Sequence, residues 1–169
     1  MSNLKKLLSA LFMFVLALSC SHLEANKKVR IAVLDFELKD LTIIPSTQAE
    51  FERTARIRPM LESELKKMGY AVVAIRSSDI DKANAGIGYL FDHHDDAAKL
   101  ARKYDADYVV VGRLHKPSYL FVYLMAHLIN VKSSKLIGDF ISEVKGGEKK
   151  LMLKGVESLA VKIDDLIGH

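Results

Sequence analysis

The chain has 169 residues, with 25 basic and 21 acidic side chains and a formal net charge of +4. A weak positive charge without a basic stripe argues against nucleic acid as a partner. The single cysteine, Cys20, excludes a disulfide within the chain, and the length suffices for one domain with its own apolar core.

The N-terminal segment has the pattern of an export signal. Lys5 and Lys6 precede about a dozen uncharged residues, Leu7 to Leu18, whereas a membrane-spanning helix needs roughly 20 apolar residues. A short apolar stretch behind lysines is typical of a secretory signal peptide, which is removed from the mature protein. We therefore expect residues 1–25 to be a signal peptide and residues 26–169 to form a single periplasmic domain.

A second mode of processing is also consistent with this segment. The residues Ala17-Leu18-Ser19-Cys20 resemble a lipoprotein box, in which the cysteine receives lipid and becomes the first residue of the mature chain. The signal would then cover residues 1–19, and Cys20 would anchor the protein to the outer membrane. Cleavage after Ala25 would instead leave a soluble periplasmic protein. Apart from a lipid at Cys20, the sequence predicts no contact with a membrane.

The first half of the domain begins with a strand and a helix. A strand is predicted at residues 29–36, because its four consecutive apolar residues suit the centre of a sheet. Thr47 and Glu50 have the spacing of a capping box, and the helix that they start extends to Gly69. Pro59 lies inside this helix and should kink or break it.

The remaining elements follow from the same patterns of apolar residues. In chain order they are a strand at 70–75, a loop with one helical turn at 76–91, a helix around 97–104, a strand at 107–114, a hairpin of strands 119–130 and 136–144, and a helix at 152–167. Helices between the first three strands indicate parallel pairing, whereas the last hairpin is antiparallel. The sequence thus predicts one α/β domain with a mixed sheet, in the order β-α-β-α-β-β-β-α.

One polar cluster has the side chains of a metal site. Histidine and carboxylate groups bind zinc and related metals, and the cluster offers Asp92, His93, His94 and Asp95. Further ligands would come from elsewhere, such as His115, His127 or Asp35. The favoured interpretation is a helix start, in which Asp92 is the N-cap and Asp95 and Asp96 complement the helix dipole. The sequence predicts no other cofactor.

The first strand of the late hairpin offers a candidate binding surface. One of its faces is uniformly aliphatic, while the other carries Tyr119, Phe121, Tyr123, Met125 and His127. A helix covering both faces would make these side chains part of the core. If part of the second face is open, its aromatic and methionine side chains are those enriched at the cores of protein interfaces. Asp35, near the carboxyl end of the first strand, is a further candidate binding residue.

Three segments, Val29–Leu38, Ala97–Leu114 and Leu128–Gly138, resemble a bacterial family of small periplasmic proteins of unknown function. That family is distantly similar to the curli-secretion lipoprotein, the N-terminal domain of TolB and the lipoprotein activators of penicillin-binding proteins. The resemblance implies an α/β fold and an accessory role in the cell envelope through a protein partner. Because no nucleophile is paired with a base in any motif, we expect a non-catalytic protein. The alternative is a periplasmic protein that binds a metal or small solute.

Overall fold

The computed structural model describes residues 28–86, 88–145 and 149–168. The expected signal peptide, both of its cleavage positions and Cys20 lie outside these residues. Within the described part of the chain, no helix combines the length and the apolar character that crossing a membrane requires.

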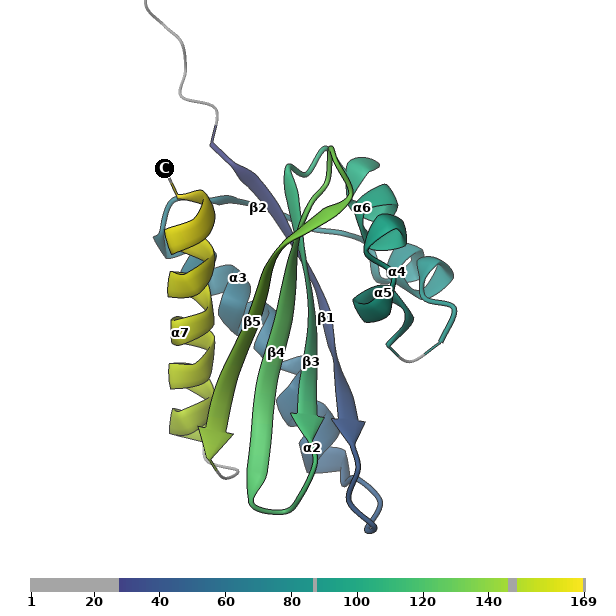
Figure 1. Ribbon diagram of the computed structural model, residues 1–169, viewed down its shortest axis with the longest axis vertical. Coiled ribbons are helices and arrows are strands. Elements are labelled where there is room, and N and C mark those ends of the chain that lie inside the picture. Colours follow the sequence, from purple (N-terminus) through teal and green to yellow (C-terminus); the bar gives the residue numbers. More distant parts are fainter. Residues whose placement is uncertain (1–27, 87, 146–148, 169) are drawn as a thin grey trace, which may run out of the picture.

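The described strands form one mixed sheet in the spatial order β2-β1-β3-β4-β5 (Figure 1). β1 pairs in parallel with β2 and β3, and β3, β4 and β5 follow as an antiparallel series. This arrangement confirms the predicted mixed sheet and the predicted late hairpin. The strands are β1 Arg30–Asp40, β2 Ala71–Val73, β3 Tyr108–Lys116, β4 Phe121–Asn130 and β5 Lys135–Lys145.

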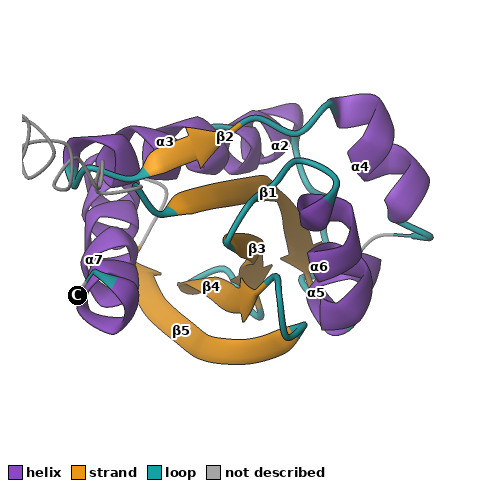
Figure 2. Cartoon of the chain, turned by 90° about the horizontal axis from the view of Figure 1, so that it is seen from above, coloured by secondary structure: helices purple, strands orange, loops and turns teal. Residues whose placement is uncertain are grey.

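Helices cover both faces of the sheet and give the domain three layers (Figure 2). One face packs against α2 Gln48–Ala55, α3 Ile57–Lys67 and α7 Lys149–Ile167, and the other against α4 Ser77–Ala83, α5 Tyr89–Asp92 and α6 His94–Arg102. The strands alternate between two apolar clusters, so that Val33 and Val110 face α3 and α7 while Leu34 and Val111 face α5 and α6. The single α/β domain predicted from the sequence is therefore confirmed.

The helix expected between Thr47 and Gly69 is broken, although not at Pro59. The capping box is present: the Thr47 amide donates to Glu50 at 2.7 Å, and the Glu50 amide donates to the Thr47 hydroxyl at 3.4 Å. The break falls at Arg56, and Pro59 is the third residue of α3. Proline is tolerated there because the first four amides of a helix have no partner within it.

The expectation of a loop with one helical turn at residues 76–91 is wrong, because this segment contains α4 and α5. Gly88, with a φ of 81°, takes the left-handed conformation that starts α5. The expected N-cap is wrong as well: Asp92 is the last residue of α5, and the residue that precedes α6 is His93, which makes no capping bond through its side chain. Asp95 and Asp96 do occupy the first turn of α6, as predicted.

Candidate interaction surface

The two sides of β4 have different surroundings. Its aliphatic side chains, Val122, Leu124, Ala126 and Leu128, are buried in the cluster that includes α7. On the opposite side, His127 stacks on Phe91 of α5, with ring centroids 3.9 Å apart. The described helices on this side reach only that end of the strand (Figure 1). The sequence left open whether a helix covers the second face, and in the structure the cover is partial.

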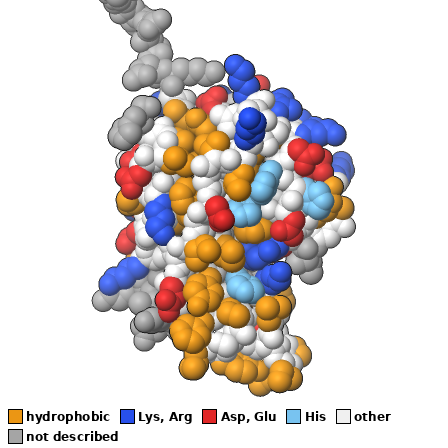
Figure 3. All heavy atoms as spheres, in the orientation of Figure 1, with side chains coloured by type: hydrophobic (Ala, Val, Ile, Leu, Met, Phe, Trp, Pro, Cys, Tyr) orange, Lys and Arg blue, Asp and Glu red, His pale blue; other side chains and the backbone are white. Residues whose placement is uncertain are grey.

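The uncovered part of this face carries a patch of apolar side chains, which we call the open sheet face. It consists of Phe121, Tyr123 and Met125 of β4 and Ile141 of β5, which lies opposite Met125 in the sheet register. Phe121 and Ile141 are exposed, and Tyr123 and Met125 are half-buried. Apolar side chains gather over this region in the space-filling view (Figure 3). Three of the six predicted binding residues thus share one surface.

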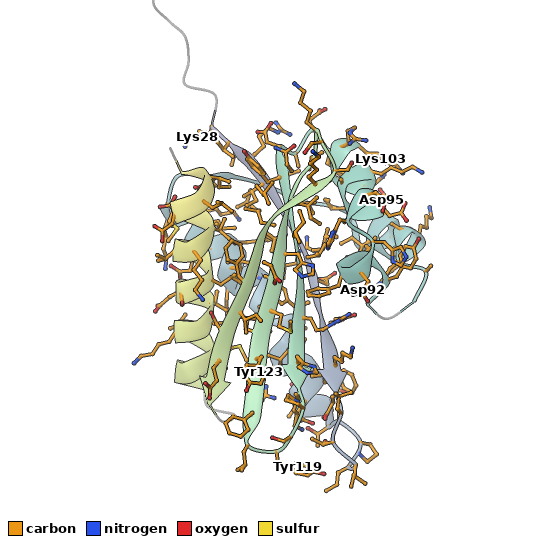
Figure 4. The ribbon with its side chains drawn as sticks, in the orientation of Figure 1. Lys28, Asp92, Asp95, Lys103, Tyr119 and Tyr123 are labelled. Atoms are coloured by element: carbon orange, nitrogen blue, oxygen red, sulfur yellow. The ribbon has the colours of Figure 1, made fainter. Side chains whose placement is uncertain are left out.

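Tyr119 lies apart from the open sheet face, in the loop before β4 (Figure 4). With Leu120 it contributes to a second apolar feature, which we call the apolar tip. The tip is formed by the loops 41–47 and 117–120 at one end of the molecule, and its side chains are Leu41, Ile43, Ile44, Tyr119 and Leu120. Ile43 is 97% exposed and Leu120 is 76% exposed, so these two side chains contribute almost nothing to the core.

Hydrogen bonds hold the two loops of the tip together. The Leu41 amide donates to the Lys116 carbonyl at 2.9 Å, and the Ile44 amide donates to the Tyr119 hydroxyl at 3.1 Å. The ring of Tyr119 also lies 5.6 Å from the ammonium group of Lys116, within the range of a cation–π contact. The exposed aliphatic side chains are therefore attached to a fixed backbone.

A buried group of charges lies beneath the tip. The Lys116 ammonium donates to Asp40 at 3.0 Å and also to Glu50, and Asp40 accepts hydrogen bonds from Thr42 and Ser46. Burial by itself would raise the pKa of Asp40, but these hydrogen bonds outweigh it and hold that pKa well below its ordinary value. The hydrogen bond to Glu50 raises the pKa of Lys116. All three groups therefore stay charged at neutral pH, and the two carboxylates share the single ammonium group of Lys116.

The four predicted metal ligands do not converge. Asp92 points to Arg113 at 3.4 Å, and the His93 ring stacks on Tyr89 with centroids 3.9 Å apart. His94 turns toward β4, while Asp95 is exposed on α6 (Figure 4). Among the residues that the structure describes, no three histidine, cysteine or carboxylate side chains are placed to hold one metal ion.

His94 does meet one of the additional ligands that the sequence offers. Its Nε2 lies 2.9 Å from Nδ1 of His127, and Nε2 of His127 lies 3.5 Å from a carboxylate oxygen of Asp139. Burial lowers the pKa of His127, and the neighbouring His94 adds to that effect, whereas the Phe91 carbonyl and the carboxylates of Asp139 and Asp92 oppose it. The pair joins α6 to the sheet at the upper edge of the open sheet face.

A buried ion pair borders the same face on the side of β1. Glu37 and Arg113 lie opposite each other on β1 and β3, in the sheet row that continues to Met125. The Arg113 guanidinium bonds to Glu37 and lies 4.1 Å from the centre of the Phe91 ring. The predicted elements do not show this pairing, because it depends on the register of two strands that are about 76 residues apart.

Asp35 does not join this surface. β1 continues to Asp40, so Asp35 lies within the strand and not near its carboxyl end. A bulge between Val33 and Phe36 leaves Asp35 exposed, and its carboxylate pairs with Arg58 of α3 at 3.2 Å. Its side chain therefore forms an ion pair with α3, on the opposite face of the sheet from the open sheet face.

Comparison with known proteins supports the fold and identifies the family. No functionally curated protein matches the chain. Among solved structures it is similar to the hypothetical protein CT253 from Chlamydia trachomatis (TM-score 0.54, 9% identity, 83% of this chain and 99% of that one). It is also similar to LpoB from Escherichia coli (TM-score 0.53, 15% identity, 71% of this chain and 59% of that one). A third similar structure is lipoprotein GNA1162 from Neisseria meningitidis (TM-score 0.51, 15% identity, 82% of this chain and 99% of that one).

These identities are low, so the similarities establish the fold alone, and the chain spans only 59% of the length of the LpoB structure. The distant similarity that the sequence indicates, to the group that includes lipoprotein activators of penicillin-binding proteins, is confirmed at the level of the fold by LpoB. The sequence profile of one family, DUF3280, described as a protein of unknown function (DUF2380), matches residues 29–163. The chain therefore belongs to the DUF3280 family.

Proposed function

We propose that this protein is an exported, non-catalytic accessory protein of the bacterial cell envelope that acts by binding a protein partner. The observation that carries the proposal is the open sheet face. Phe121, Tyr123, Met125 and Ile141 lie on a part of the sheet that the described helices leave uncovered. Apolar patches of this kind on soluble domains mark interaction sites, and aromatic and methionine side chains are enriched at interface cores.

The borders of the open sheet face have the chemistry of an interface rim. Asp139 lies beside His127 at the upper edge, and the Glu37–Arg113 pair closes the side toward β1. A polar rim around an apolar centre is the usual anatomy of a protein interface. The open part of the sheet suits a partner with a complementary apolar surface of its own.

Two further observations support a role in the envelope. The N-terminal residues have the pattern of an export signal. One of the solved structures with this fold bears the name of a lipoprotein, GNA1162. The location and the mode of anchoring of this chain belong to the proposal.

Site-specific photo-cross-linking in the native host tests the proposal. A photoreactive amino acid replaces Ile141, which is 51% exposed, and in a matched control it replaces Val161, which is 48% exposed on α7. We expect a discrete cross-linked protein from position 141 and none from position 161. Equal products at both positions, or none at position 141, would contradict the proposed surface.

The alternative function, binding of a metal or small solute, is supported by the contact between His94 and His127. Their ring nitrogens converge at 2.9 Å, with Asp139 nearby. Under this alternative, zinc, copper or nickel raises the melting temperature, and the rise fades below about pH 6 because metals bind neutral imidazole. The variant H94A/H127A should abolish that rise, whereas His93→Ala, whose ring stacks on Tyr89, should retain it. An unchanged melting temperature in the parent protein would exclude binding of these metals.

A further inference from the structure

The apolar tip has a composition that the function proposed above does not use. The loop at residues 41–47 reads Leu-Thr-Ile-Ile-Pro-Ser-Thr, and the loop at 117–120 reads Pro-Ser-Tyr-Leu. Neither loop contains a charged residue. The exposed aliphatic side chains at this end therefore lie among uncharged neighbours, which is unusual for turns at the surface of a soluble domain.

The tip is also convex. Both loops extend beyond the end of the sheet, and apolar side chains cover that end of the molecule (Figures 1 and 3). The exposed fraction of 97% at Ile43 means that almost no other part of the protein contacts this side chain. A projecting pair of loops does not match the flat surface of a typical protein partner, but it can enter a soft apolar phase without a preformed pocket.

The charged residues next to the two loops favour a lipid surface as the partner of the apolar tip. Asp40 and Lys116, which flank the two loops, are hydrogen-bonded to each other, so both charged groups are held beneath the tip and neither extends from it. The residue before Asp40, Lys39, is exposed, and its side chain has no ion pair or hydrogen bond among the described residues. An apolar tip beside a free lysine is complementary to a bilayer surface with anionic headgroups. The amphipathic ring of Tyr119 at the base of the tip suits the boundary between headgroups and acyl chains.

We infer that the apolar tip inserts into the interfacial region of a bilayer that contains anionic phospholipid. Ile43, Ile44 and Leu120 would enter the acyl boundary while Lys39 contacts the headgroups. This contact is separate from any lipid on Cys20, because Lys28, where the described chain begins, lies at the opposite end of the molecule from Tyr119 (Figure 4). It does not depend on the open sheet face, and it goes beyond the membrane contact expected from the sequence.

A single tryptophan tests the inference, because the chain has none of its own. In the mature protein we replace Ile43 with Trp and add vesicles of phosphatidylcholine with phosphatidylglycerol. We expect the emission of Ile43→Trp to shift to shorter wavelength and to be quenched by lipids brominated in their acyl chains. The control Val161→Trp on α7 should show neither effect. A local reporter distinguishes insertion of the tip from attachment through lipid at Cys20.

Two further variants make the result decisive. In the Ile43→Trp background, Ile44→Ser with Leu120→Ser should weaken partitioning at least about tenfold, because two exposed aliphatic side chains are lost. Lys39→Glu should remove the dependence on phosphatidylglycerol. All of these positions are exposed, so circular dichroism should show an unchanged fold. An emission that vesicles leave unchanged, or one that shifts only on adding a partner protein, would overturn the inference.

Discussion

At the scale of single residues, the ion pairs around the open sheet face differ in burial, and this difference predicts their energetic importance. Arg113 and Glu37 are both nearly buried, whereas the second partner of Arg113, Asp92, is 64% exposed. Glu37→Gln leaves a buried guanidinium without its main counter-charge, which should cost about 3–5 kcal/mol of unfolding free energy. Asp92→Ala should cost less than about 1 kcal/mol. Urea unfolding at pH 7 measures both values, and equal losses would contradict this assignment.

Because of the charges beneath the apolar tip, we expect the stability of the parent and that of the variant Lys116→Met to change in opposite directions as the pH falls. In the parent, the lowered pKa of Asp40 contributes stability that is present above about pH 4 and is lost as the pH falls below it, since the unfolded chain takes up the proton first. Lys116→Met leaves Asp40 and Glu50 as neighbouring buried carboxylates, each of which lost its hydrogen-bonded cation. Their pKa values should then rise, so the variant should gain stability from pH 7 to pH 5. Urea unfolding across this range tests the reversal, and a variant with the parent's profile would contradict it.

The error at Asp92 shows where residue-level prediction fails. The sequence Asp-His-His-Asp-Asp before an apolar stripe is a reasonable helix start, and the acidic first turn is indeed present. The cap is absent because a short helix, α5, ends where the cap was expected and directs Asp92 toward Arg113. Four-residue helices have no periodicity to detect, so their effect on a neighbouring cap is invisible in the sequence.

At the scale of elements, the contact of His94 with His127 joins α6 to the sheet and makes the stability depend on pH. Burial lowers the pKa of His127 below 6.5, so the unfolded chain binds its proton more readily. Stability should therefore be highest above about pH 6.5 and should fall as the pH decreases toward 5.5. His127→Gln should reduce this slope. Urea unfolding between pH 7.5 and pH 5.5 gives the comparison, in which identical slopes would show that other groups are responsible.

Elements with long apolar patterns were predictable, and short ones were not. The strands around Ile31 and Val110 and the C-terminal helix follow directly from runs and stripes of apolar residues. β1 nevertheless extends four residues beyond its predicted end, because its pairing with β3 continues past the bulge as far as Asp40. The segment 76–91 was missed since α4 and α5 bury only a few side chains each, such as Ile80 and Phe91.

At the scale of the whole molecule, the sequence predicts the layers and which side chains of β4 share a face, but not which part of that face is open. The alternation along β4 correctly separates an aliphatic side from an aromatic one. Which part of the aromatic side is open depends on the length of α5 and α6, and the contribution of Ile141 depends on the register of β5. The apolar tip combines two loops that are about 75 residues apart, which only the fold brings together.

The most direct test of the central claim is the affinity of the open sheet face for the purified partner identified by cross-linking. We compare the parent with Phe121→Ser/Ile141→Ser and with the matched pair Leu153→Ser/Val161→Ser, whose side chains are similarly exposed on α7. The account predicts that the first pair raises Kd at least about tenfold, because two interface side chains lose their apolar burial, while the second pair leaves Kd unchanged. Unchanged binding in the first pair, with both variants folded, would contradict the claim that this protein acts through its open sheet face.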